Sequence, residues 1–263
     1  MGRIKKFKKG DYLQVSLDTQ MFGNKVDLDI NEHSYIKKTT NVPYVLPKTI
    51  TPELAEFIGM YMADGNIKTG NGTKAISITN SSKQVRDRII YLVSKLFNIV
   101  PKDKKSHNRV EYVTFNSLGL VTWLEDVLEF GHGAPNKTVP KIVLESTKEV
   151  QQAFIKGLSL DSSTKKKKYP SIYFSSVSKE LIDRLNIMLN NLGYFTRLSK
   201  SIDMRGYLDC YSLQLTYENV EKYISEIGFV QDEKHSVCQD KLENYLVNKP
   251  FKPKKKVLFK GKT

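Results

Sequence analysis

The sequence predicts an α+β fold made of two pseudo-symmetric halves, each in the order αββαββα, packed through paired central helices. Three observations predict it: an apolar helix-like segment occurs twice, similar strand-like and helix-like segments follow each copy, and both copies carry small residues at every fourth position. Gly157 lies 98 residues after Gly59 (157 − 59). Self-similarity at such a separation indicates repeated structural units, and two copies favour a packed pair over a solenoid.

The first central helix is predicted to begin at Thr51, a good N-cap, with Pro52 at the first helical position. Residues 54–62 are almost all apolar, which is typical of a helix buried on every side. The run ends at Asp64, followed by Gly65. Taken alone, this ending is compatible with an ordinary helix cap. Its recurrence in the second half favours a functional carboxylate.

The second central helix is predicted over residues 146–161, opened by a capping box from Ser146 to Glu149. It ends near a second acid, Asp161. The small residues of the two helices form rows that would let their backbones approach closely: Ala55, Gly59 and Ala63 in the first, Ala153 and Gly157 in the second.

Alternating apolar and polar residues predict half-buried strands behind each central helix. In the first half we expect a hairpin of 66–68 with 75–79, a helix over 83–97, a strand over 110–115 and a helix over 118–130. In the second half we expect strands over 171–176, 196–200 and 211–216, with helices over 179–192 and 218–227.

These segments divide the chain into four parts. We expect a basic N-terminal extension over 1–46, a first half over 47–136, a second half over 137–245 and a basic tail over 246–263. The lysines near the N-terminus fit either an arm on DNA phosphates or a solvated tail. We expect the C-terminal tail to pack poorly unless it lies on DNA.

The net charge of +14 at pH 7 predicts a polyanionic partner, most plausibly nucleic acid. Excess lysine could serve solubility alone, but the basic residues gather in runs beside the strands. Cys210 and Cys238 form neither a metal-ligand spacing nor a disulfide framework, which favours a reducing compartment, cytoplasmic or organellar. The sequence shows neither a secretion signal nor a membrane-spanning stretch. Scattered histidines and the absence of a P-loop disfavour histidine-metal and nucleotide-hydrolysing chemistries.

Residues 57–65, Phe-Ile-Gly-Met-Tyr-Met-Ala-Asp-Gly, resemble the motif that names the LAGLIDADG homing endonucleases. Residues 154–163 resemble a second, altered copy. Residues 137–146 are similar to the segment before the second motif in intron- and intein-associated members. The resemblance extends over residues 46–245.

The resemblance implies a monomeric, site-specific endonuclease that hydrolyses phosphodiester bonds of double-stranded DNA with Mg²⁺. It implies four-stranded sheets that form a saddle over a long pseudo-palindromic or asymmetric target. Ca²⁺ is expected to support binding without cleavage. Asp64 and Asp161 are the expected metal ligands, one acid per half for opposite strands. Asn80 and Lys165 are counterparts of polar residues near the scissile phosphates, although a simple phosphate contact fits Lys165 better.

Paired central helices would bring the two acids together, where they would bind hard divalent cations. Without metal they would repel, and one would gain a raised pKa. Asp64 lies five residues after Gly59, but five residues after Gly157 comes Ser162, so Asp161 is one position early. One residue rotates a helix by about 100°, which puts Asp161 in line with Ala63 unless the helix ends or unwinds. If it cannot reach the metal, a nickase, a DNA-binding protein or an intron maturase becomes the alternative.

The polar faces of the strands are expected to meet base edges in the major groove. An ordinary solvent-exposed strand face is the alternative for each residue. The candidate DNA-binding residues are Lys68, Ser77, Thr79, Lys166, Lys168, Tyr173, Ser175, Arg197, Ser199, Ser212 and Gln214.

Overall fold

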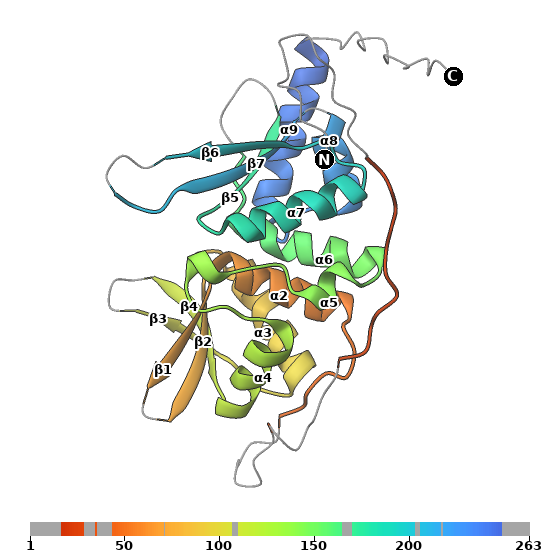
Figure 1. The fold of residues 1–263 in the computed structure, drawn as a ribbon. Helices are drawn as coiled ribbons and strands as arrows, with labels where there is room; N and C mark the ends of the chain where they lie inside the picture. The colour runs from red at the N-terminus through yellow and green to blue at the C-terminus, as the bar shows by residue number, and fades with distance from the viewer. Residues whose placement is uncertain are drawn as a thin grey trace.

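The computed structural model describes residues 17–28, 35, 44–70, 72–106, 110–164, 170–202, 206–216 and 218–248. It confirms the α+β prediction. The two halves lie one above the other, with helix α2 (Pro52–Asp64) and helix α6 (Lys148–Leu158) side by side between them (Figure 1). Both sheets lie toward the same side of the molecule.

Helix α2 forms as its sequence predicts. The Thr51 hydroxyl accepts a hydrogen bond from the backbone N–H of Leu54 at 3.2 Å, which satisfies one free donor of the first turn. Residues 54–62 are all buried. Because no face of this helix meets water, burial of its apolar side chains is its main source of stability.

The two central helices touch through their backbones at the predicted glycines. A Cβ atom on Gly59 would lie 2.2 Å from the carbonyl oxygen of Phe154, and one on Gly157 would lie 2.1 Å from that of Glu56. No side chain fits at either position. The other residues of the two rows line the same core: Ala55 is buried, and Ala63 and Ala153 are partly buried.

The start of α6 differs from the predicted capping box. The N-cap is Thr147, and its side chain makes no capping hydrogen bond. Ser146 is buried instead, and its hydroxyl donates to the Val143 carbonyl at 2.7 Å. The reason is the short helix α5 (Lys141–Leu144), which ends just before and occupies Ser146 at its own C-terminus.

The first half contains a four-stranded antiparallel sheet. Its order is β1-β2-β4-β3, with β1 Gly65–Gly70, β2 Thr73–Thr79, β4 Glu111–Asn116 and β3 Lys102–Lys105. One face buries the apolar side chains Ile67, Ile76, Ile78, Val113 and Phe115 against helices α3 (Lys83–Phe97) and α4 (Leu118–Leu128).

The second half repeats this plan with a sheet in the order β5-β7-β6. Its elements are β5 Ser171–Ser176, α7 Lys179–Asn191, β6 Arg197–Ser201, β7 Cys210–Thr216 and α8 Glu218–Glu226. The fourth strand that the resemblance implies would precede β5, where Ser163 forms an isolated bridge with Tyr173. Residues 165–169 lie outside the described residues, so the fourth strand stays a prediction.

Helix α9 (Asp232–Asn248) follows α8 and is not among the predicted elements. It packs against α8 and buries Cys238. In the described parts of the chain, no helix is long and apolar enough to cross a bilayer. The rest of the tail lies outside the described residues.

Residues 17–28 of the N-terminal extension lie along the helical side of the molecule, away from the sheets (Figure 1, red). The Asn191 side chain holds them to the second half, because its carbonyl oxygen accepts from the Met21 N–H at 2.8 Å. An ion pair between Lys25 and Glu145 follows at 3.1 Å. This part of the extension therefore braces the body, whereas the basic residues 3–9 lie outside the described residues.

Candidate metal centre and nucleic-acid interface

The two acids are carried by helix ends of different geometry. Asp64 is the last residue of α2, whereas α6 ends at Leu158 and continues as a 3₁₀ turn, Ser159–Asp161. A 3₁₀ turn advances by about 120° per residue, so Asp161 leaves the line with Ala63 that a continuous α-helix would give it. The two carboxylates lie near enough for Asp64 to perturb Asp161. Ser162 does not replace an acid, because it is buried and its hydroxyl donates to the Ser159 carbonyl at 2.6 Å.

Burial raises the affinity of both acids for protons, and the charge of Asp64 adds to this effect at Asp161. The pKa of Asp161 rises to about 6, first because of desolvation and then because of the charge on Asp64. Desolvation also raises the pKa of Asp64, while a hydrogen bond from Asn80 and the charges of Lys137 and Lys234 oppose that rise. The predicted repulsion between the acids is therefore present, and it bears more heavily on Asp161.

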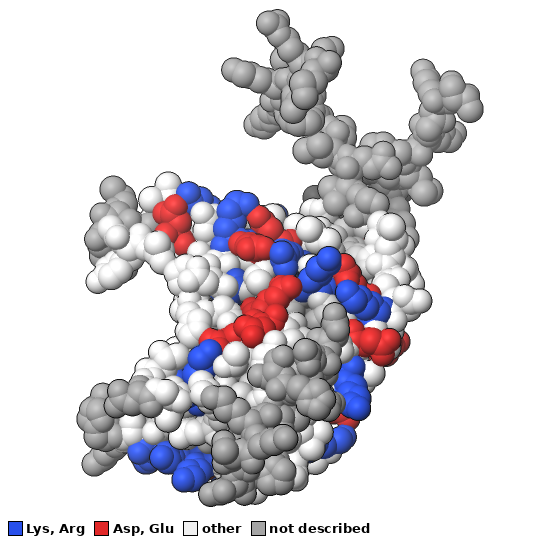
Figure 2. All heavy atoms as spheres, turned by 60° about the horizontal axis from the view of Figure 1, so that its bottom comes forward, with Lys and Arg blue, Asp and Glu red and all other residues white. Residues whose placement is uncertain are grey.

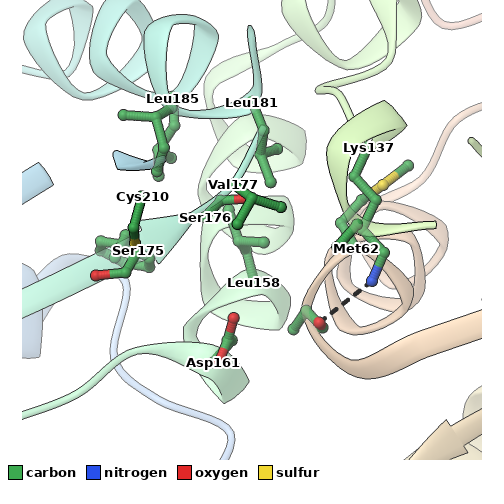
Figure 3. A pocket seen from close by; sticks show the side chains of 14 residues that line it. Met62, Lys137, Leu158, Asp161, Ser175, Ser176, Val177, Leu181, Leu185 and Cys210 are labelled. Atoms are coloured by element: carbon green, nitrogen blue, oxygen red, sulfur yellow. Dashed lines mark hydrogen bonds between the residues drawn. The ribbon is translucent and has the colours of Figure 1, made fainter. Parts of the chain in front are cut away.

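Lys137 lies at the end of α2. Its ammonium group donates to the carbonyl oxygens of Tyr61 and Ala63, each at 3.3 Å (Figure 3, where the dashed line marks the bond to Ala63). These carbonyls belong to the last turn of the helix, where the helix dipole is negative; the Tyr61 carbonyl also accepts from the Gly65 N–H. Lys137 is buried, and desolvation lowers its pKa.

Lys234 does the same for the second half. It extends from α9, and its ammonium group donates to the carbonyls of Leu160 at 2.5 Å, Ser162 at 2.7 Å and Ser159 at 3.0 Å. Desolvation lowers its pKa, while Asp64 and Asp161 oppose that shift.

Neither lysine is among the site residues predicted from the sequence, although a shared spacing marks the pair. Lys137 follows Asp64 by 73 residues (137 − 64), and Lys234 follows Asp161 by 73 (234 − 161). Each lysine therefore folds back onto the end of the central helix that precedes it in the chain. The result is a centre of two carboxylates and two ammonium groups.

Asn80 lies beside the first acid, as predicted for the site. Its side-chain NH₂ donates to Asp64 at 3.3 Å, and its carbonyl oxygen accepts from the Ser82 N–H at 3.0 Å. Ser176 holds the corresponding place in the second half, where its hydroxyl accepts from the Ser178 N–H at 3.0 Å. Among the described residues, no side chain donates a hydrogen bond to Asp161. The other predicted site residue, Lys165, lies outside the described residues.

The donor set fits a hard divalent cation that shares its coordination with a nucleic acid. The structure places only two carboxylates here, and no group of three His, Cys, Asp or Glu side chains occurs among the described residues. Mg²⁺ is usually held by one or two carboxylates together with substrate phosphates and water. A cavity of about 260 Å³, lined by Asp161 and Lys137 among others, opens beside Asp161 (Figure 3).

The outer face of the first sheet is polar and basic. Strand register places Lys68, Ser77 and Thr79 on this face, opposite the buried apolar side. Lys68 and Thr79 are exposed, whereas Ser77 is buried and its hydroxyl donates to Thr114 at 3.2 Å. Ser77 is therefore less accessible to DNA than the prediction requires.

The outer face of the second sheet collects six of the predicted residues in two cross-strand rows. One row is Tyr173–Gln214–Arg197 and the other is Ser175–Ser212–Ser199. The rows are hydrogen-bonded: Gln214 donates to Tyr173 at 2.6 Å, and the Ser175 and Ser212 hydroxyls lie 2.9 Å apart. The predicted Lys166 and Lys168 lie outside the described residues.

Neither outer face carries a carboxylate among its described strand residues. Elsewhere the surface is mixed, and an acidic band crosses the face shown in Figure 2. The two sheet faces are therefore suited to a polyanion.

Comparison with known proteins identifies the fold family. The sequence profile of the LAGLIDADG-like domain matches residues 51–154 and 149–228, so it covers most of the chain in two copies. This chain belongs to the LAGLIDADG family.

Two curated relatives and one solved structure illustrate the likeness. The chain is 27% identical over 84% of its length to the ATP-dependent DNA helicase Hel308 of Thermococcus kodakarensis, of which it spans 19%. It is 23% identical over 60% of its length to the glutamine–fructose-6-phosphate aminotransferase of Methanocaldococcus jannaschii, of which it spans 14%. The structure of I-DmoI in complex with DNA and Mn aligns with a TM-score of 0.52 at 20% identity, covering 68% of this chain and 97% of I-DmoI.

Strand register also places on the outer face of the first sheet six residues that are not among the DNA-binding candidates predicted from the sequence. They are Asn66, Lys102, Lys104, Tyr112, Thr114 and Asn116, all on the strands of the first sheet. The short basic run 102–105 gave no alternation of apolar residues, because β3 is an exposed edge strand. Only its pairing with β4 in the structure shows that this segment is a strand.

The raised pKa of Asp161 predicts a pH-dependent stability of the metal-free protein. Its folded pKa is about 6, above the usual 3.8, so the folded state holds this proton more tightly. Stability from this group is therefore greatest at low pH and is lost as pH rises through about 6. We expect Asp161→Asn to raise the melting temperature at pH 7.5 and to have a clearly smaller effect near pH 4.5, where the folded-state carboxyl is still protonated.

Thermal denaturation in EDTA at both pH values measures this effect. Asp183→Asn is the matched control, because Asp183 is an exposed carboxylate on α7 that pairs with Lys179. An equal change at both pH values, or none at pH 7.5, would contradict the assignment of the destabilising charge to Asp161.

Proposed function

We propose that this chain is a site-specific endonuclease that hydrolyses double-stranded DNA with divalent metal ions. The observation that carries the proposal is the centre formed by Asp64 and Asp161. The two acids stand at equivalent ends of paired helices, between two outer sheet faces whose described residues lack carboxylates. A structural role alone would leave two repelling, partly desolvated carboxylates unexplained.

The protein's own groups divide the work. The sheet faces hold the duplex through lysine and arginine contacts to phosphates and polar contacts to base edges. Asp64 and Asp161 would hold Mg²⁺, which when bound stabilises charge on the scissile phosphate and supplies an activated water. Lys137 and Lys234 favour the ionised form of both acids. Asn80 orients Asp64 through its amide.

We also propose that the module belongs to a mobile intron or intein. The curated relatives are named for unrelated activities, a DNA helicase and an aminotransferase, and the match spans less than a fifth of each. A segment shared by proteins with so little in common is unsuited to carry either activity. It fits an element inserted into different hosts.

The rival is a DNA-binding protein, nickase or maturase on the same fold. The specific observation in its favour is the weaker second half-site, where Asp161 receives from the described residues no counterpart of the amide hydrogen bond that Asn80 gives to Asp64. The possibilities differ in how many strands are cut: both by the endonuclease, one by a nickase and neither by a binding protein or maturase.

The test is a selection on randomised duplex DNA. The full chain is bound to the library in Ca²⁺, the enriched sequence is recovered, and Mg²⁺ is then added while each labelled strand is followed separately. We expect an enriched sequence and cleavage of both strands. Tight specific binding with neither strand cut would show that the chain is a binding protein and not an enzyme. Cleavage of one strand only would identify a nickase.

The basic edge of the first sheet should contribute strongly to DNA affinity. We expect Lys102→Ala with Lys104→Ala to weaken binding at all sequences and to reduce the slope of log K against log salt by roughly 2, since each phosphate contact contributes about 0.9. Fluorescence anisotropy in Ca²⁺ over a series of salt concentrations measures this slope.

The control is Lys83→Ala with Lys179→Ala, which removes two exposed lysines paired with Asp87 and Asp183 on the helices. The same loss of slope in the control would show that net charge, rather than the sheet face, determines binding.

A further inference from the structure

A buried arginine holds the turn that carries Asn80. Arg86 lies on α3 and is 6% exposed. One of its terminal nitrogens donates to the backbone carbonyls of Asn80 at 3.0 Å and Ser81 at 2.9 Å. The same guanidinium pairs with Asp103 at 3.0 Å and Glu111 at 2.8 Å. The turn between β2 and α3 is thereby fixed to the sheet edge formed by β3 and β4.

This anchorage reaches the first acid through a single residue. The Asn80 carbonyl is held by Arg86, and the Asn80 side chain donates to Asp64 at 3.3 Å. That bond is already near the upper limit of hydrogen-bond length. A small displacement of the turn would therefore remove it.

The second half has no arginine at this place, and among the described residues its turn is held instead by the Ser178 hydroxyl, which donates to the Lys137 carbonyl at 2.6 Å. Helices α3 and α7 begin at Lys83 and Lys179, 96 residues apart (179 − 83), so Ile182 takes the place of Arg86. Lys105 pairs with Glu111 in the first sheet, and Lys200 pairs with Tyr211 at the equivalent position of the second sheet. Two residues earlier on each edge strand, Leu198 therefore stands where the first half has Asp103. The charged cluster of the first half is thus replaced by side chains that cannot donate to the turn.

The turn of the second half borders open space instead. Ser176, Val177 and Ile182 line the cavity of about 260 Å³ beside Asp161 (Figure 3). The corresponding turn of the first half is tied down by four hydrogen-bonding partners of Arg86. The two turns next to the acids therefore differ in how firmly they are held.

We infer that Arg86 is a positioning residue that holds Asn80 on Asp64 and so makes the two half-sites unequal. This inference rests on the proposed endonuclease function. The half-site of Asp64 is pre-organised, whereas that of Asp161 is ordered only when DNA and metal bind. One strand of the target is consequently cut faster, and its rate depends on Arg86.

The test uses Arg86→Lys in the full chain. Lysine keeps the positive charge for Asp103 and Glu111, which preserves the fold, but it lacks the fork that reaches both carbonyls and both acids. The control is Arg184→Lys on α7, where Arg184 also donates to a backbone carbonyl, that of Val139 at 2.6 Å. Asn80→Ser gives the first half the residue of the second and identifies the strand served by Asp64.

Two readouts are taken. The first is single-turnover cleavage of each labelled strand at saturating enzyme. In Arg86→Lys the rate should fall about tenfold on one strand, and Asn80→Ser should slow the same strand. A loss of this size is usual when a hydrogen-bond partner of a metal ligand is removed. The side-chain amide signals of Asn80 in the ¹⁵N spectrum of the free protein should shift in Arg86→Lys and stay in place in Arg184→Lys.

The outcomes separate the inference from the proposed function. Unchanged Asn80 signals in Arg86→Lys would overturn the positioning role, whatever the cleavage rates. Shifted signals with equal slowing of both strands would overturn the inequality of the half-sites. If the unaltered chain cuts neither strand, the proposed function fails, and the Asn80 signals alone decide whether Arg86 positions the first half-site.

Discussion

Replacing Asp64 with asparagine should reduce cleavage of the strand that Asp64 serves by about a thousand-fold or more, which corresponds to about 4 kcal/mol of transition-state stabilisation. The amide keeps the size of the side chain but removes the charge that would hold the metal. DNA affinity in Ca²⁺ should change only a few-fold, because the strand residues of both sheet faces are untouched. Single-turnover cleavage and anisotropy on the same duplex measure the two quantities.

Asp183→Asn is the matched control for this substitution. It neutralises an exposed carboxylate on α7 that pairs with Lys179. The control should cut both strands at the unaltered rate. Retention of cleavage of both strands in Asp64→Asn, or equal losses in the two variants, would show that the acid at the end of α2 is not part of the reaction centre.

The second large effect is expected on stability. In Gly157→Ala the new Cβ atom would lie 2.1 Å from the Glu56 carbonyl oxygen and 2.9 Å from the Met60 nitrogen. Both atoms belong to the backbone of α2, so the helices must separate. Overpacking of this kind costs about 3 kcal/mol, which lowers the melting temperature by about 10 °C for a chain of this size.

Gly70→Ala provides the comparison, because a Cβ atom on Gly70 would meet nothing within 4 Å. Its melting temperature should stay within a degree or two of the unaltered protein by the usual size of surface effects. A Gly157→Ala protein as stable as the Gly70→Ala protein would refute the close backbone crossing of α2 and α6.

Local features carried most of the fold prediction. Thr51 and Pro52 start α2, and the helix over 83–97 has the predicted bounds, because caps and apolar periodicity are properties of neighbouring residues. The glycines at 59 and 157 predicted the crossing, since a small residue in an apolar helix indicates close approach. The mistaken capping box at Ser146 shows the limit, because Thr147 caps α6 and α5 takes Ser146.

The candidate site was less predictable because its parts are distant in sequence. Asp64 and Asp161 were found from the repeated motif. Lys137 and Lys234 approach the acids from elements that no local pattern connects to them. The 3₁₀ turn that carries Asp161 presents its carbonyls to Lys234, which lies on a helix far along the chain. Arg86 likewise acts through long-range pairing with β3 and β4.

The most direct test of the central claim is the position of the metal. Crystals of the full chain with its selected duplex, grown in Mn²⁺ in place of Mg²⁺, would show the ions by their anomalous scattering. We predict peaks at about 2.1 Å from carboxylate oxygens of Asp64 and Asp161, the distance of divalent ions of this size. Mn²⁺ peaks that avoid both carboxylates in a DNA-bound complex would contradict the account.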